Sequence, residues 1–113
     1  MDITAKAEGP AWVVSLAGHL DMAAAAEANS FLNQQMQAGH VNLVADLSQV
    51  VYLSSASLRV LLAVAKDARR QGGDMRLAAV QSDEVNKVLR MSGFSNILKV
   101  YPDTAQAAAS FAA

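Results

Sequence analysis

Residues Val41 to Gln71 read VNLVADLSQVVYLSSASLRVLLAVAKDARRQ, and this stretch decides the fold. It begins with a strand pattern, VNLVADL, which ends near Leu47. A short polar joint follows, and then a second apolar patch runs from Val50 to Leu53. A group of hydroxyls at residues 54–57 precedes a helical pattern that extends to Gln71.

The hydroxyl side chains between the second apolar patch and the helix belong to Ser54, Ser55 and Ser57, and we call residues 54–57 the serine joint. They lie where the first N–H groups of a helix have no helical partner, so a serine there can cap the helix. The same helix end carries a positive potential that favours an anion, including a phosphate attached to serine. We therefore predict that this joint carries the function and that the other elements hold it in place.

The composition indicates one domain without cofactor or metal. The chain has 113 residues, the size of a single domain, and 53% hydrophobic residues are enough to fill one core. A net charge of −1 argues against nucleic-acid binding, which needs a basic surface. The sequence has no cysteine, which excludes disulfides and thiolate metal sites. Its two histidines are too few for most metal sites.

The sequence also predicts a cytoplasmic location. The N-terminus, MDITAKAEGP, lacks the basic segment and apolar run of a secretory signal. The longest purely apolar run, Val60 to Ala65, is too short to span a bilayer. We expect no contact with a membrane.

Strand and helix patterns alternate along the rest of the chain. The predicted strands are Ile3–Glu8, Trp12–Leu16, Val41–Leu47, Met75–Val80 and Ile97–Tyr101, the first two forming a hairpin and Gly18 ending the second. The predicted helices are Met22–Gln37 capped by Asp21, the helix that follows the serines, Asp83–Met91 capped by Ser82, and a last helix that Pro102-Asp103-Thr104 opens and that ends at Phe111. The order β-β-α-β-α-β-α-β-α predicts an α/β fold with one mixed, mostly parallel sheet and about four helices, formed by residues 1–113 as a single domain.

This topology places polar groups at one edge of the sheet. A strand-helix-strand connection makes the Trp12 and Val41 strands parallel, so their C-terminal ends share the edge where open α/β sheets place their sites. The groups expected at that edge are His19, Asp21, Asp46, Ser48 and the serines of residues 54–57. His40 lies at the opposite end of its strand, about 20 Å away, and can hardly act on Ser55.

The helix after the serines is apolar on two faces. Helical spacing predicts that one face lies on the sheet, with Leu58, Leu61, Leu62, Ala65 and Ala68. The opposite face, with Ala56, Val60, Ala63 and Val64, is also largely apolar. Either a neighbouring helix covers Val60 and Val64, or this face is a protein-docking surface beside the serines.

These residues resemble a known family. ADLSQVVYLSSASLRVLLAVAKDARRQGGDMRLAAV is similar to the core of the STAS domain, named for sulfate transporters and anti-sigma factor antagonists. AGHLDMAAAAE upstream, VNKVLRMSGFSNILKVYPD downstream and the terminal TAQAAASF are also similar to that family. The resemblance covers nearly the whole chain and implies an α/β domain with the element order given above.

In the antagonist branch of that family the joint is usually Asp-Ser-Ser/Ala-Gly, and the serine after the aspartate is phosphorylated. The resemblance places Ser54 at the aspartate position, Ser55 as the phosphoacceptor, Ala56 as the small residue and Ser57 at the glycine. The chain therefore departs from the pattern twice. Ser57 can still enter a helix, whereas loss of the aspartate removes a charge beside the acceptor and leaves Ser54 as a rival acceptor.

The resemblance implies a switch based on partner binding. The unmodified protein would bind an anti-sigma factor that is also a serine kinase of the histidine-kinase-like ATPase type. Phosphorylation of Ser55 would release the complex, and a metal-dependent serine phosphatase would restore the unmodified state. A monomer or weak dimer is expected.

Several residues have a structural and a functional interpretation. Ser55 is a phosphoacceptor or a simple cap, Asp21 a helix cap or a partner contact, and Arg59 a solvated side chain or a contact for an acidic partner or phosphate. Asp46 is expected to bond backbone groups in the joint. The partner contacts that we predict are His19, Asp21, Ser54, Ser57, Arg59, Val60, Ala63 and Val64.

Two other functions compete with this one. The first is a STAS subunit of a transport or other signalling complex without a phosphoswitch, which the loss of the aspartate keeps open. The second is a hydrolase with Ser55 on a strand-to-helix elbow. However, the glycines of G-x-S-x-G are absent and only His19 could serve as the base, so we predict that the protein is not an enzyme.

Overall fold

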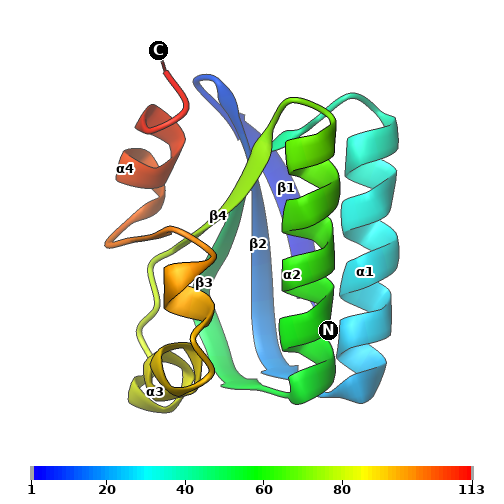
Figure 1. Cartoon of the computed structure of the whole chain (residues 1–113). Coiled ribbons are helices and arrows are strands. Elements are labelled where there is room, and N and C mark those ends of the chain that lie inside the picture. The colour runs from blue at the N-terminus through cyan, green and yellow to red at the C-terminus, as the bar shows by residue number, and fades with distance from the viewer. Residues whose placement is uncertain (1, 113) are drawn as a thin grey trace.

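A five-stranded sheet with the strand order β1-β2-β3-β4-β5 forms the middle of the computed structural model, which describes residues 2–112 (Figure 1). The strands are β1 (Asp2–Glu8), β2 (Ala11–Leu20), β3 (Asn42–Leu53), β4 (Asp74–Ala78) and β5 (Val100–Tyr101). The helices are α1 (Met22–Gln37), α2 (Ser55–Arg70), α3 (Asp83–Met91), the 3₁₀ helix η1 (Phe94–Asn96) and α4 (Thr104–Ala109). Among the described residues, β1 and β2 form the antiparallel pair and the other three strand pairs are parallel. The predicted α/β class and element order are confirmed.

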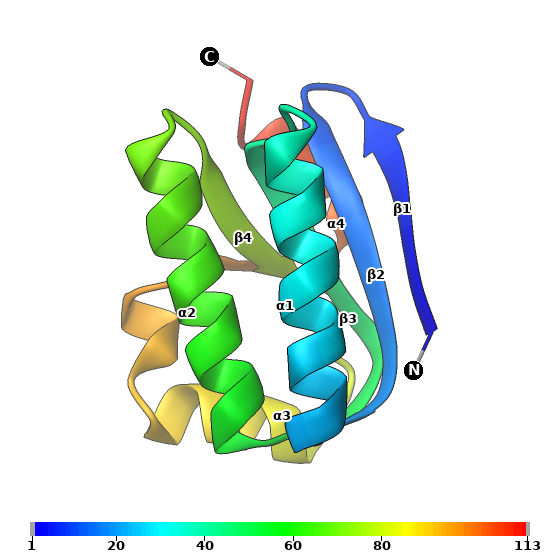
Figure 2. The ribbon, with the colours of Figure 1, turned by 90° about the vertical axis from the view of Figure 1, so that its right-hand side faces the viewer.

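Alternation along the strands divides the core into two layers. On β3, Leu43, Ala45 and Leu47 belong to the larger core, which α1, α2 and α3 cover, whereas Val44 belongs to a smaller core under α4. Helices α1 and α2 lie side by side over the larger core (Figure 2). Because both helices run from the C-terminal end of one strand back to the start of the next, their N-termini lie at the same end of the molecule (Figure 1).

The helices begin where the sequence predicts. Asp21 accepts a hydrogen bond from the N–H of Ala24 at 2.9 Å, and Ser82 accepts one from Val85 at 3.3 Å. Each therefore satisfies an N–H group that has no partner inside its own helix. Asp103 caps α4 in the same way.

The strands differ from the prediction in length. Gly18 does not end β2, which continues to Leu20, and β3 is one continuous strand rather than two apolar patches separated by a joint. β4 ends before Val80, and α4 ends at Ala109 before Phe111. β5 is reduced to Val100–Tyr101, because the chain still turns at Ile97 and bends at Leu98 after η1.

Two register shifts explain how β3 passes through the polar joint. Ser15 pairs with Asp46 but Ala17 pairs with Gln49, and Gly18 pairs with Val50 but His19 with Tyr52. Each shift adds one residue to β3, which is the geometry of a β-bulge. A bulge absorbs a residue without ending the strand, and the period-2 pattern therefore breaks while the pairing continues.

Asp46 and Ser48 consequently lie inside β3 and not at its end, which corrects their predicted place at the sheet edge. The Asp46 carboxylate accepts a hydrogen bond from the Ser15 hydroxyl at 2.9 Å and one from the N–H of Ser48 at 3.0 Å. Asp46 bonds a backbone N–H group, as expected. However, the two hydrogen bonds of Asp46 stabilise the β2–β3 pair and not the serines at residues 54–57.

The second apolar face of helix α2 is covered in part, and Ala63 on this face stays exposed. Val64 is only 1% exposed, and Val60 packs partly buried against the larger core. The neighbouring helix α1 provides this cover, as the structural alternative predicted. Within residues 2–112 the helices are all too short or too polar to cross a lipid bilayer.

Candidate functional site

The C-terminal ends of β2 and β3 meet beside the first turns of α1 and α2, at the lower end of the molecule in Figure 1. Leu20 pairs with Leu53, and the N–H of Ser54 donates to the carbonyl of Leu20 at 3.0 Å. Asp21 and Ser54, the residues that follow the two strands, are therefore held next to each other. This is the convergence at the sheet edge that the topology predicts.

Ser54 is the N-cap of α2. Its hydroxyl oxygen accepts from the N–H of Ser57 at 3.1 Å, and its carbonyl accepts from the N–H of Leu58 at 3.0 Å. The hydroxyl of Ser57 donates to the same carbonyl at 2.7 Å, and a further contact of 3.2 Å joins the two hydroxyls. Ser57 is only 3% exposed, so its predicted role as a partner contact is wrong, because its side chain is turned into the cap.

Ser55 has a different environment from its neighbours. It is the first residue of α2 and its side chain is exposed. The N–H groups of Ser55 and Ala56 stand at the first two helical positions, where no carbonyl of the same helix can reach them. Arg59, also exposed, is one helical turn further along and therefore on the same side of α2 as Ser55.

The two serines should differ in what they contribute to stability. We expect Ser54→Ala to lower the free energy of unfolding by about 1 kcal/mol, because it removes the hydroxyl that satisfies the N–H of Ser57. Ser55→Ala, at an exposed position, should change it by less than about 0.5 kcal/mol. Urea denaturation followed by circular dichroism measures both. Equal losses in the two variants would contradict the assignment of Ser54 as the cap.

Exposed apolar side chains surround this edge, and the sequence interpretation did not identify them. Met22 at the start of α1 is 77% exposed, and Val51 and Tyr52 near the end of β3 are 48% and 45% exposed. The second bulge of β3 lies at Val51 and Tyr52, and it pairs Tyr52 with His19. The ring centroids of His19 and Tyr52 are 6.2 Å apart. We call Met22, Val51 and Tyr52 the apolar collar. The sequence shows an apolar patch from Val50 to Leu53 but does not show which of its side chains are exposed.

A shallow groove between α1 and α2 continues from the collar. It contains three of the predicted partner contacts, Arg59, Val60 and Ala63. The rest of its lining consists of Met22, Ala25, Ala26, Asn29 and Ala56. Val64, the fourth predicted contact on this helix, lies beneath the groove and is buried, so the structure contradicts that prediction. The Val64 side chain is buried where α2 packs against α1.

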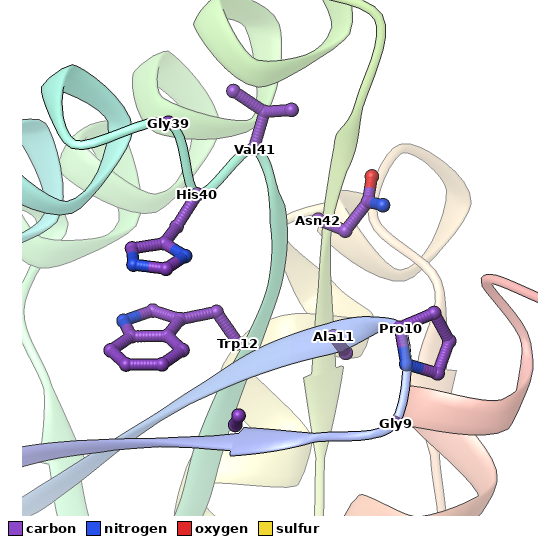
Figure 3. A pocket seen from close by; sticks show the side chains of 9 residues that line it. Gly9, Pro10, Ala11, Trp12, Gly39, His40, Val41 and Asn42 are labelled. Atoms are coloured by element: carbon purple, nitrogen blue, oxygen red, sulfur yellow. The ribbon is translucent and has the colours of Figure 1, made fainter.

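A second pocket lies at the other end of the sheet, where the hairpin and the α1–β3 loop meet (Figure 3). It measures about 230 Å³, and the His40 imidazole stacks on the Trp12 indole with centroids 3.8 Å apart. The indole N–H donates to Gln35 at 2.8 Å, which fixes the ring. His40 is thus far from Ser55, as predicted, and serves the packing of the loop. Residues 2–112 contain no group of three or more His, Asp or Glu side chains placed to hold a metal ion.

Comparisons with known proteins agree with this arrangement. The sequence profile of the STAS domain matches residues 2–107. A protein of Bordetella bronchiseptica, BtrV, named as a candidate anti-sigma factor antagonist, is 35% identical over 99 residues, which cover 88% of this chain and 84% of BtrV.

Two solved structures have the same fold. The crystal structure of an anti-sigma factor antagonist from Mycobacterium paratuberculosis gives a TM-score of 0.86 at 22% identity and covers 96% of this chain and 92% of its own. The phosphorylated form of SpoIIAA, a cell fate determinant of Bacillus, gives 0.70 at 16% identity and covers 94% of this chain and 96% of its own.

Proposed function

This chain belongs to the STAS domain family, and from that membership we propose that it is an anti-sigma factor antagonist whose binding is switched by phosphorylation of Ser55. The observation that carries the proposal is the exposed hydroxyl of Ser55 at the first position of α2, beside the apolar collar. The naming of BtrV and of the Mycobacterium paratuberculosis structure as antagonists supports the general role. In this role the protein is a cytoplasmic binding module and not an enzyme.

Within the domain, a phosphate on Ser55 meets favourable groups. The N–H groups of Ser55 and Ala56 and the positive end of the helix favour an anion at this position. Arg59, one turn further on, offers a guanidinium on the same side of the helix. The fold therefore tolerates the modified serine. That SpoIIAA was solved in a phosphorylated form, with the same fold, supports this view.

In a complex the same phosphate is unfavourable. A partner that covers the apolar collar would bury Ser55 beside Met22, Val51 and Tyr52, and these side chains offer a phosphate no positive charge and only the neutral hydroxyl of Tyr52. Phosphorylation adds roughly −1.5 to −2 charges at neutral pH, which would have to lose their hydration in the interface. A loss of about 2.7 kcal/mol is enough to weaken binding a hundredfold. One phosphate is thus sufficient to release the partner.

The proposed partners follow from this chemistry. The first is an anti-sigma factor that is itself a serine kinase, so that the protein that binds the collar also modifies Ser55. The second is a metal-dependent serine phosphatase that restores the unmodified state. His19, Asp21, Ser54, Arg59, Val60 and Ala63 remain proposed contacts, together with the apolar collar.

The absence of the usual aspartate at residue 54 changes the charge of the site but not its cap. Ser54 forms the same kind of N-cap hydrogen bond that an aspartate side chain would form. Its hydroxyl is bonded to Ser57, whereas that of Ser55 is exposed, and this difference favours Ser55 as the acceptor. A kinase for this protein would have to recognise the joint without a carboxylate next to the acceptor.

The test of the proposal is phosphorylation by the cognate kinase with ATP, followed by mass spectrometry of the peptides. We expect one phosphate on Ser55 in the wild type and in Ser54→Ala, and none in Ser55→Ala. A phosphate on Ser54 would move the switch to the rival acceptor. Binding of an ATPase with no phosphorylation at either serine would instead support the alternative, a STAS subunit of a transport or signalling complex.

A further inference from the structure

The outer edge of β1 is unpaired. β1 is the first strand in the sheet order and pairs only with β2, and Figure 2 shows it as the outermost strand. All seven residues from Asp2 to Glu8 pair with β2 in one continuous register, without a bulge, and the strand contains no proline. An edge with this regular geometry presents a row of free N–H and C=O groups that can pair with another strand.

We propose that β1 pairs with β1 of a second copy of this chain, antiparallel, about a two-fold axis at Thr4. This register places Asp2 opposite Lys6 of the second copy, and by symmetry Lys6 opposite its Asp2. Thr4 faces Thr4 and Ile3 faces Ala5 of the second copy. The sheets of the two copies then form one sheet of ten strands.

The charges on the strand select this register among its neighbours. A shift of two residues in one direction places Asp2 opposite Glu8, and a further shift places Lys6 opposite Lys6, so each brings like charges together. A shift in the other direction places Asp2 opposite Thr4 and Ile3 opposite Ile3, so both Asp2–Lys6 pairs are lost. A shift of one residue turns the apolar face of one strand toward the polar face of the other.

The burial of β1 agrees with this pairing. Asp2, Thr4 and Lys6 are exposed, whereas Ile3 and Ala5 are half-buried and pack with Phe31 against the larger core. A second copy would cover what remains exposed of these apolar side chains. Within residues 2–112, Asp2 and Lys6 have no ion-pair partner in the monomer. Both are therefore available to a second copy.

The dimer leaves the Ser55 site free. β1 is separated from β3 by β2, and the antiparallel arrangement directs the C-terminal ends of β3 in the two copies to opposite ends of the joint sheet. Each copy then presents its own serine joint. An edge contact of five residues on each strand is smaller than a stable interface, so the association is weak and depends on concentration.

Charge reversal tests the register. Sedimentation equilibrium of the wild type should show a concentration-dependent dimer. Asp2→Lys alone and Lys6→Glu alone should each weaken self-association about tenfold, because two attractive pairs become repulsive. An equimolar mixture of the two variants should form a heterodimer with an affinity near that of the wild type, since every lysine then faces a carboxylate. Native mass spectrometry separates heterodimer from homodimer by mass.

Two results would overturn the proposal. One is a wild type that remains monomeric up to its solubility limit. The other is a dimer that neither reversal weakens, or a mixture that forms no excess of heterodimer, because either would place the contact elsewhere. Asp2 and Lys6 are exposed, and thermal denaturation should confirm that the variants are folded.

Discussion

Replacing Ser55 with aspartate should weaken the complex with the anti-sigma partner about a hundredfold and leave the domain folded. Ser55 is exposed at the first position of α2, where a carboxylate is favoured by the helix end and costs the free domain nothing. In the complex the same carboxylate would be buried beside the apolar collar without a partner for its charge. Isothermal titration calorimetry with the purified kinase measures the loss.

Two variants separate the position of the charge from its presence. Ser30→Asp adds the same charge on an exposed residue in the middle of α1, and its affinity should stay within about threefold of the wild type. Ser55→Ala should bind like the wild type but should no longer be released by kinase and ATP. If Ser55→Asp bound as tightly as the wild type and Ser55→Ala could still be phosphorylated, Ser55 would not be the switch.

The largest effect on stability is expected from Gly73→Ala. The added Cβ would lie 2.0 Å from the carbonyl oxygen of Val41 and 2.9 Å from its Cβ. That carbonyl also accepts the N–H of Asp74 at 3.0 Å, which joins the start of β4 to the chain leading into β3. The clash is with backbone that cannot move without breaking the pairing of β4. We therefore expect the free energy of unfolding to fall by about 3 kcal/mol or more.

The adjacent glycine provides the control. Gly72 has a φ of +90° and open space around the position of a Cβ, so Gly72→Ala should cost only about 1 kcal/mol, for the left-handed backbone. Urea denaturation of the two variants compares the costs directly. A Gly73→Ala protein as stable as Gly72→Ala would show that β4 can move away from Val41.

Asp74 connects three elements at this end of the sheet. Its carboxylate accepts from Arg69 at 2.8 Å and from Arg76 at 3.1 Å, and Arg76 also donates to Ser110 at 2.6 Å. The network joins the last turn of α2, the start of β4 and the end of α4. Because the C-terminal end of α2 is fixed in this way, its N-terminal end holds Ser55 at a defined place on the sheet edge.

Much of the architecture could be predicted because it depends on local patterns. The caps Asp21 and Ser82 were identified from short polar side chains before apolar helical repeats, and the structure confirms both. The alternation of strands and helices was enough to place Asp21 and Ser54 at one sheet edge. The prediction that Ser55 rather than Ser54 is the phosphoacceptor depended on the family resemblance, which set the register of the serines.

The errors arose where a residue's environment depends on distant parts of the chain. Gly18 and the polar joint after Leu47 resemble strand ends, but pairing with the neighbouring strand continues through both by means of two bulges. Val51 and Tyr52 belong to an apolar patch of the sequence, and the structure shows both exposed at the second bulge. Val64 was placed on an open face because helical spacing cannot show that α1 lies across it.

The sequence by itself determined the order of the elements, the caps and the edge at which the serines stand. These features depend on side-chain periodicity and on hydrogen bonds between residues a few positions apart, and both can be recognised in a single chain. The tertiary structure alone decided which apolar side chains remain exposed around Ser55, that Ser57 and Val64 are buried, and that Gly73 has no room for a methyl group. Those outcomes depend on which distant part of the chain packs against a residue, and no local sequence pattern identifies that part.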